Sequence, residues 1–272
     1  MFDKDAIEAL QHGAGIKQGN EAVTRITDSG AVALPNHFQL HDLEPYMMFR
    51  RRQRGHMATN SVASFAEYCK AHAEDGARVF IDSESMTAKA VLNLGNTDGP
   101  GHADNTASVT LTKTAAFEAL LTHANGRGMT QTQMAEFLED WPDLIECYKD
   151  SANVTNKQAI AAIRKLTVES MRKLENEEQA LAASKTTFEA VKATSSDPIP
   201  THIYFKCVPY AGLPERTFVL RFGVLTSGPT TVLRIVKREE HEEEMAEEFA
   251  QRVTDAIGDS IPVTIGKYSR AQ

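Results

Sequence analysis

The chain has 272 residues, of which 42% are hydrophobic and 24% charged, and its formal net charge is −8 at pH 7. These values are typical of a soluble globular protein with one large domain or two small ones. The acidic balance argues against a dedicated duplex-DNA-binding protein with a basic surface. Because no apolar run approaches the roughly 20 residues of a membrane span and the acidic N-terminus is unlike a signal peptide, we expect a cytoplasmic protein without membrane contact.

The N-terminal part is predicted to contain two helices joined by irregular chain. The first helix covers residues 2–12, and short extended pieces follow between residues 31 and 43. The second helix covers residues 61–72, with Asn60 or Ser61 as its cap. The apolar side chains at helical spacing on its buried face are Val62, Phe65, Ala66 and Cys69.

Residues 77–141 are the most informative stretch, because strand periodicity is followed there by helix periodicity. Strands over residues 77–82 and 87–94 predict a hairpin, and a third strand over residues 107–113 follows a Gly-rich loop. Two helices, over residues 114–124 and 130–141, close the stretch. We predict that these elements pack as a single α+β unit.

The chain after Trp141 is harder to interpret. Residues 142–149 are predicted to form a brief helix, and residues 157–165 a second helix because of their Ala and Ile content. For residues 166–193 the sequence does not decide between helix and strand. Their Glu, Lys, Leu and Ala content favours helix, whereas TVESM and TTFEAV alternate as strands do.

The C-terminal part predicts an antiparallel meander followed by a helix. Its three β-rich runs, residues 201–210, 216–225 and 230–237, are separated by turn residues. The helix over residues 239–257 is expected to lie on that sheet, and residues 261–266 can add a last strand. The apolar stripe of this helix consists of Met245, Phe249, Val253 and Ile257.

The fold class predicted from these elements is α+β, with antiparallel sheets and helices packed on one face. We divide the chain into an N-terminal region, residues 1–150, and a C-terminal region, residues 151–272. The three cysteines, Cys69, Cys147 and Cys207, have no CxxC spacing and stand beside apolar or aromatic neighbours. They are predicted to be buried structural thiols rather than disulfides or metal ligands.

One dense basic run, FRRRQRG at residues 49–55, is the best binding candidate in the sequence. Arginines beside aromatic side chains can hold a nucleic-acid backbone and stack on bases. They can equally pair with the acidic surface of a neighbouring subunit, and a solvated edge or intramolecular pairing is the plain alternative. The candidate residues are Tyr46, Phe49, Arg50, Arg51, Arg52 and Arg54.

The loop over residues 95–105 is a second candidate, because it combines glycines with Asp98, His102 and Asp104. A His with two Asp residues can bind a metal ion or transfer protons. The spacing, however, matches neither a dinucleotide fingerprint nor a P-loop. The favoured interpretation is a long hairpin loop whose Gly, Asn and Asp residues satisfy turn geometry.

Seven glutamates crowd residues 239–248, with His241 among them. Met245 stands where an HExxH zinc motif requires its second His, so we predict no metal there. A solvated helix face is the simplest explanation, and a counterpart of the arginine run between subunits is the alternative.

The order of several blocks resembles the YfdQ-like family of phage and prophage proteins, a domain of unknown function. The blocks are VFIDSESMTAKAVLNLG, PGHADNTASVTLTKTAAFEALL, QTQMAEFLEDWPDLI and a C-terminal half containing IYFKCVPYAGLPERTFVLRFGV, and they cover the chain from about Ser64 onward. The resemblance supplies no catalytic residue; His102 matches a family position that is compatible with a structural role. Relatives commonly have a tryptophan at the position of Phe117. The phenylalanine is compatible with the same packing role. The family implies a phage accessory protein encoded near recombination and nucleotide-metabolism genes.

Three functional hypotheses follow. The first is a non-enzymatic phage accessory protein, without a cofactor, that self-associates and acts through macromolecular contacts on nucleic-acid or host-defence machinery in an infected or lysogenic bacterium. The second is a single-stranded nucleic-acid binding or recombination accessory that uses the arginine run. The third is a metal-dependent hydrolase centred on the loop over residues 95–105.

Overall fold

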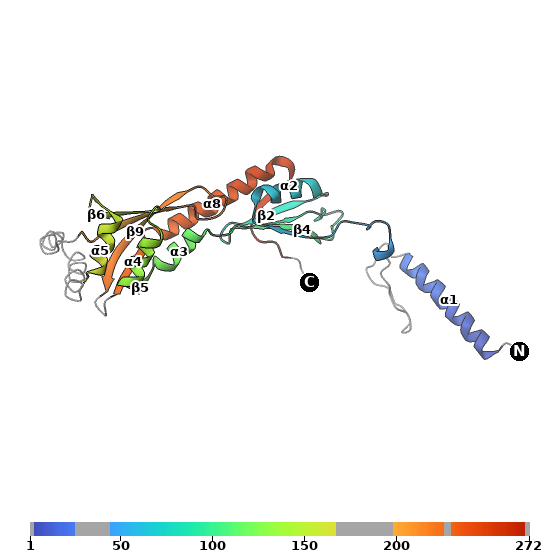
Figure 1. Ribbon diagram of the computed structural model, residues 1–272. Helices are drawn as coiled ribbons and strands as arrows, with labels where there is room; N and C mark the ends of the chain where they lie inside the picture. Colours follow the sequence, from blue (N-terminus) through green and yellow to red (C-terminus); the bar gives the residue numbers. More distant parts are fainter. Residues whose placement is uncertain (1–2, 25–43, 167–197, 226–229, 270–272) are drawn as a thin grey trace. The chain divides into compact units, whose positions relative to one another are not determined.

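The computed structural model describes residues 3–24, 44–166, 198–225 and 230–269. The chain divides into two compact units, Met1–Gln53 and Arg54–Gln272, and each is described by itself. The second unit combines helices with two mostly antiparallel sheets (Figure 1). The predicted α+β class is therefore confirmed.

The first unit contains the helix α1 (Lys4–Thr24) and the short 3-10 helix η1 (Glu44–Tyr46). The predicted helix over residues 2–12 is too short. Gly13, Gly15 and Gly19 disfavour a longer helix by propensity, but good helix formers stand between them and carry it onward. The extended pieces predicted over residues 31–43 lie outside the described residues, as does the undecided stretch after Leu166.

A five-stranded sheet in the order β1-β4-β3-β2-β11 forms one part of the second unit. Its strands are β1 (Gly55–Thr59), β2 (Arg78–Asp82), β3 (Thr87–Val91), β4 (Asn105–Thr110) and β11 (Val263–Ile265). The three central strands are antiparallel, which confirms the predicted hairpin and third strand. The strands β1 and β11 add to the two edges in parallel orientation.

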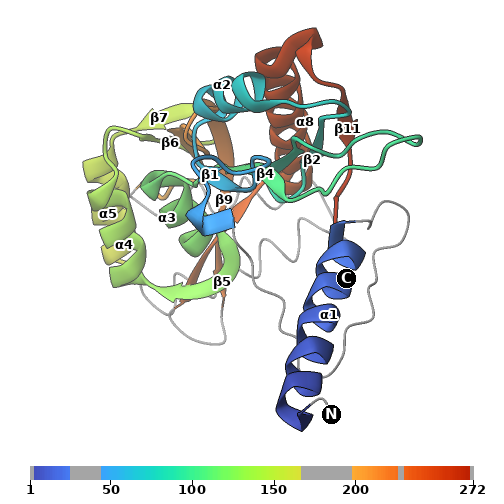
Figure 2. The ribbon, with the colours of Figure 1, turned by 90° about the vertical axis from the view of Figure 1, so that its right-hand side faces the viewer.

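Two helices, α2 (Val62–His72) and α8 (Arg238–Ile257), lie side by side on this sheet (Figure 2). The Ser61 side chain caps α2, as predicted, by accepting a hydrogen bond from the backbone N–H of Ser64 at 3.3 Å. The predicted core faces are also confirmed. The buried residues are Phe65, Ala66 and Cys69 of α2 and Met245, Phe249, Val253 and Ile257 of α8, while Val62 is partly buried.

The place predicted for α8, on the C-terminal meander, is wrong. Its closest packing is with α2 and β2, whereas the strand β9 (Arg216–Leu225) meets its N-terminal half through Arg216 and Phe218. An apolar stripe shows that one face of a helix is buried, but it does not show which element covers that face. A short 3-10 helix, η2 (Gly258–Ser260), follows α8.

A six-stranded antiparallel sheet in the order β5-β10-β9-β8-β6-β7 forms the other part of the second unit. Besides β9, its strands are β5 (Asn125–Thr130), β6 (Ile145–Lys149), β7 (Ala152–Val154), β8 (His202–Cys207) and β10 (Thr230–Ile235). The strands β8, β9 and β10 confirm the predicted meander. Residue 150 lies in the turn between β6 and β7, so the predicted regions 1–150 and 151–272 both contribute strands to this sheet.

The brief helix predicted over residues 142–149 is wrong, because β6 occupies most of that stretch. Its side chains alternate, with Ile145 and Cys147 buried and Glu146 exposed. This alternation is the strand pattern, but over five residues it is too short to distinguish from a helix by periodicity alone. β5 was not predicted at all, since its sequence NGRGMT contains two glycines and no apolar alternation.

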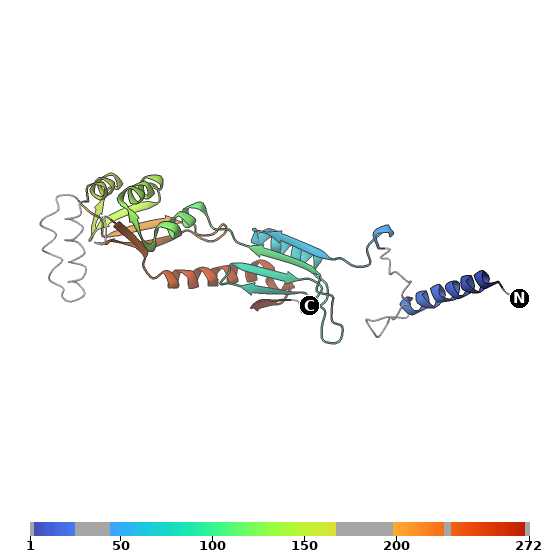
Figure 3. The same ribbon diagram turned by 90° about the horizontal axis from the view of Figure 1, so that it is seen from below.

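Three helices, α3 (Ala115–His123), α4 (Gln131–Asp140) and α5 (Asn156–Arg164), pack on the six-stranded sheet (Figure 3). Capping boxes begin α4 and α5, through Thr130 with Gln133 and through Thr155 with Gln158. The strands and helices predicted over residues 77–141 do lie in one compact unit, but the strands belong to the five-stranded sheet and the helices pack on the six-stranded sheet. Local periodicity reports the type of an element and not its sheet.

Buried apolar side chains from both sheets and their helices form one continuous core cluster. All three cysteines lie within that cluster, which confirms their predicted burial. None of the helices in the described part of the chain combines the length and the apolar character needed to cross a bilayer.

Candidate macromolecule-binding segment

The most exposed apolar side chains of the described residues lie at the last residue of η1 and directly after it. Tyr46 and Met48 are each 88% exposed and Phe49 is 78% exposed. Glu44 holds the turn that presents them. Its carbonyl oxygen accepts a hydrogen bond from the backbone N–H of Met47 at 3.1 Å, and its Oε1 accepts one from the backbone N–H of Arg51 at 3.2 Å.

The arginines of this run differ in their surroundings. Arg50, Arg51 and Arg54 are exposed and Arg52 is half-buried. Arg52 and Arg54 interact with other residues of the chain. Within the described residues no ion pair or hydrogen bond engages the guanidinium group of Arg50 or Arg51. We call residues Tyr46–Arg51 the arginine segment. All of them belong to the first compact unit, Met1–Gln53.

Arginine and aromatic side chains together are the residue types most enriched in protein interfaces and in single-strand binding surfaces. In the arginine segment both types stand in solvent, next to each other in the chain. The segment can therefore supply cation–π stacking, bidentate pairing with carboxylate or phosphate, and apolar area to a partner. The sequence identified these residues, but their exposure came only from the structure.

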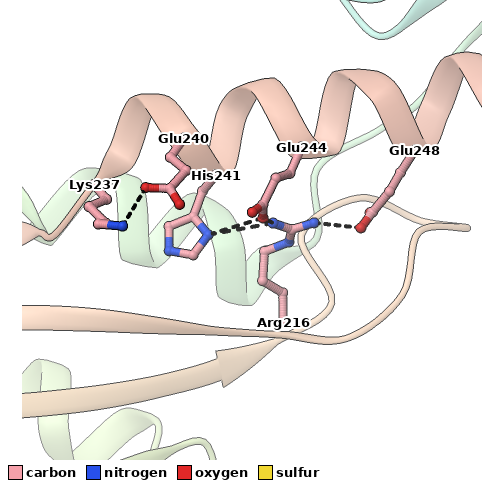
Figure 4. A network of polar contacts seen from close by, with 6 residues as sticks. All are labelled: Arg216, Lys237, Glu240, His241, Glu244 and Glu248. Carbon is pink, nitrogen blue, oxygen red and sulfur yellow. Dashed lines mark hydrogen bonds and ion pairs between the residues drawn. The ribbon is translucent and has the colours of Figure 1, made fainter.

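The acidic run on α8 is largely occupied within the molecule (Figure 4). The Arg216 side chain from β9 is only 10% exposed and forms ion pairs with Glu244 and with Glu248, the latter over 2.7 Å from Nη2 to Oε1. His241 completes this cluster, with Nδ1 3.4 Å from Arg216 Nη1 and its ring against that of Phe218. These ion pairs therefore connect β9 of the six-stranded sheet to α8, which packs on the five-stranded sheet.

Two further glutamates of the run pair near the start of α8. Lys237 Nζ lies 2.8 Å from Glu240 Oε2, and this hydrogen bond lowers the pKa of the Glu240 carboxyl group. Arg238 Nε donates to Glu242 Oε1 at 2.8 Å, one helical turn onward. Among the described residues, Glu239, Glu243 and Glu247 have no ion-pair partner and face solvent.

The loop over residues 95–105 joins the antiparallel strands β3 and β4, as its hairpin interpretation predicts. Asp98 and His102 are exposed, whereas Asp104 is half-buried and accepts a hydrogen bond from Asn93 Nδ2 at 2.9 Å. Asn93 Oδ1 in turn accepts from the backbone N–H of Asp104 and of Asn105 at 3.1 and 3.0 Å. In this arrangement Asp104 fixes the base of the loop, whereas His102 is exposed and takes no part in these hydrogen bonds.

Sequence reasoning missed Asn93, the buried amide that anchors this loop. Its signal was weak, since a single Asn after a strand is ordinary turn chemistry. The sequence predicts Gly95 as a turn residue, and the backbone conformation gives the reason. Its φ is +73°, and a Cβ there would collide with the backbone of Gly99 and Gly101.

In the described parts of the chain, no three His, Cys, Asp or Glu side chains gather closely enough to hold a metal ion. The three thiols have no disulfide partner, and burial raises the pKa of Cys69, Cys147 and Cys207 to about 12 each. A thiol with such a pKa is almost entirely protonated at neutral pH and is a poor nucleophile.

A comparison with protein families gives one match. The family described as an uncharacterized conserved protein, DUF2303, matches residues 3–268 and so covers both compact units. No curated protein and no solved structure matches the chain.

Proposed function

Since the chain belongs to the DUF2303 family of uncharacterized conserved proteins, we propose that it is a non-enzymatic accessory protein that works by binding macromolecules through the arginine segment. The first macromolecule that the segment binds is a second copy of the same chain, so the protein self-associates. The resemblance of the sequence blocks to YfdQ-like phage proteins supports a role in an infected or lysogenic bacterium, in contact with nucleic-acid or host-defence machinery.

The exposure of Tyr46, Met48 and Phe49 carries this proposal. Large apolar side chains that stand consecutively in solvent cost free energy unless a partner covers them. Arg50 and Arg51, which follow directly, are cations on a chain with a net charge of −8. A second copy of the same acidic chain is thus an electrostatically complementary partner for the segment.

Size-exclusion chromatography with light scattering tests the proposal at protein concentrations from 1 to 100 μM. We expect the wild-type mass to rise above 29.9 kDa with concentration, and the double variant Tyr46→Ser, Phe49→Ser to stay monomeric. Ile265→Ser is the matched control, because Ile265 is 66% exposed on β11, away from the segment in sequence. A strictly monomeric wild type over the whole range would refute self-association.

A second candidate function is single-stranded nucleic-acid binding, favoured by the proximity of two exposed aromatic side chains to the two arginines. Bases stack on aromatic side chains and arginines pair with phosphate. Fluorescence anisotropy with a labelled oligonucleotide at 50 and 200 mM salt tests it. Binding that weakens with salt and is lost in Arg50→Ala, Arg51→Ala would support this function, whereas no binding at 50 mM salt would end it.

A further inference from the structure

A shallow, open groove lies along α8 where the loop between β8 and β9 passes the helix. Its volume is about 690 Å³, and Leu213 and Pro214 form its wall on the loop side. The helix side is formed by Glu247, Gln251 and Asp255, which follow each other at intervals of four residues. This spacing places their side chains on one face of the helix, so a single elongated ligand can meet all three.

The groove is acidic. Glu247 and Asp255 are exposed carboxylates, and Arg252 is the only cation in the lining. Asp255 Oδ1 accepts a hydrogen bond from Gln251 Nε2 at 2.7 Å, which orders it on the helix face. A third lining carboxylate, Glu248, is already bound by Arg216. Two carboxylates therefore remain for a basic ligand, beside an apolar wall.

The arginine segment has the chemistry that complements this groove. It offers two guanidinium groups without described partners, which can pair with two carboxylates, and aromatic rings, which pack on proline and aliphatic side chains. Both surfaces combine charge with apolar area, and their charges are opposite.

We propose that the arginine segment of one copy binds the α8 groove of a second copy. The proposal rests on the self-association proposed above and adds the surface that receives the segment. The two surfaces are different parts of the chain, so the contact is heterologous, and its repetition builds a ring or a filament rather than an isolated pair.

Charge reversal on each surface tests this pairing. In the groove variant, Glu247→Lys is combined with Asp255→Lys; in the segment variant, Arg50→Glu is combined with Arg51→Glu. Each variant alone places like charges against each other, so we expect its self-association to weaken roughly 100-fold. An equimolar mixture restores opposite charges at both contacts, and we expect it to assemble. Sedimentation velocity measures the three samples.

The matched control is Glu239→Lys combined with Glu243→Lys, which makes the same charge change on α8 outside the groove. It should assemble like the wild type. Far-UV circular dichroism checks that every variant is folded. If the groove variant assembles normally while the segment variant does not, self-association stands but the groove is not its receptor. If the mixture fails to assemble, direct pairing of the two surfaces is refuted. A monomeric wild type would remove the proposed function itself.

Discussion

The acidic run of α8 and the arginine segment are the two most charged stretches of this sequence, and the fold treats them differently. Four of the glutamates of α8 pair with Arg216, Lys237 or Arg238. The arginine segment instead presents its aromatic and apolar side chains to solvent, with two guanidinium groups that no described residue engages.

This difference shows how a charged run can be interpreted. From the sequence, the acidic run is explained by a solvated helix face or by one half of an interface. The arginine run at residues 49–55 is explained by nucleic-acid contact, by subunit contact, or by a solvated or internally paired edge. Intramolecular partners account for more than half of the glutamates, so most of that run belongs to the fold. In the arginine run, Arg52 and Arg54 also interact within the chain. The arginine segment differs because exposed apolar side chains stand directly before Arg50 and Arg51, and these favour an external partner.

The largest effect on the free energy of unfolding is expected for a substitution on the buried face of α8. Phe249 is fully buried, and Phe249→Ala should lower the free energy of unfolding by about 3–5 kcal/mol through lost burial and an unfilled cavity. Urea denaturation measures the change. Glu243→Ala, on the solvent side of the same helix, should stay within about 0.5 kcal/mol of the wild type. Similar losses in the two variants would contradict the packing described.

The next effect concerns the ion pairs that join α8 to β9. Arg216→Met should cost about 2–3 kcal/mol, because it leaves Glu248 without its cation. This is below the cost of breaking a fully buried pair, since the side chains of Glu244 and Glu248 are 52% and 37% exposed.

Arg238→Met is the control for this prediction. It removes an exposed pair with Glu242 within one helix turn and should cost no more than about 0.5 kcal/mol. The same denaturation experiment compares the two variants. Equal costs would show that Arg216 contributes no more than a surface pair.

A smaller contrast is expected inside the Gly-rich loop. Gly101→Ala should destabilise by about 1–3 kcal/mol, because the new Cβ would collide with the backbone of Asn93 and Leu94. Gly99→Ala meets only Asn96 Oδ1 at 3.8 Å and should be nearly neutral. Thermal unfolding followed by circular dichroism distinguishes them. A neutral Gly101→Ala would mean that the loop base is not fixed as described.

The smallest effect on stability is expected in the arginine segment. Tyr46→Ser with Phe49→Ser should change the free energy of unfolding by less than about 0.5 kcal/mol, since neither side chain is covered by the fold. The same variant should lose self-association. A large loss of stability, measured on the monomer in urea, would show instead that these aromatics support the fold.

Much of the fold could be predicted from the sequence where a pattern was long or chemically distinct. The meander β8–β10 came from three β-rich runs, and Ser61 marked the start of α2. Short or glycine-rich strands such as β6 and β5 gave too little periodicity. The position of α8 could not be found, because its stripe shows burial without identifying what covers it.

The sequence predicted which residue types make up the candidate site, but not that they are exposed. The sequence showed arginines beside Tyr46 and Phe49, but aromatic side chains are usually covered, and nothing local indicated that these two are exposed. The partner of Glu248 is 32 residues away at Arg216, a separation over which a sequence gives no pairing information. The functional residues of the loop at 95–105 stay a prediction, apart from the anchoring role of Asp104.

Hydrogen–deuterium exchange at 1 and at 100 μM protein tests the central claim most directly, because it reports whether the arginine segment becomes covered when copies meet. We expect peptides that cover residues 44–54 to exchange more slowly at the higher concentration, while peptides from the core strands of both sheets stay unchanged. Exchange of residues 44–54 that is independent of concentration, in a sample whose mass does rise, would show that the copies associate through another surface.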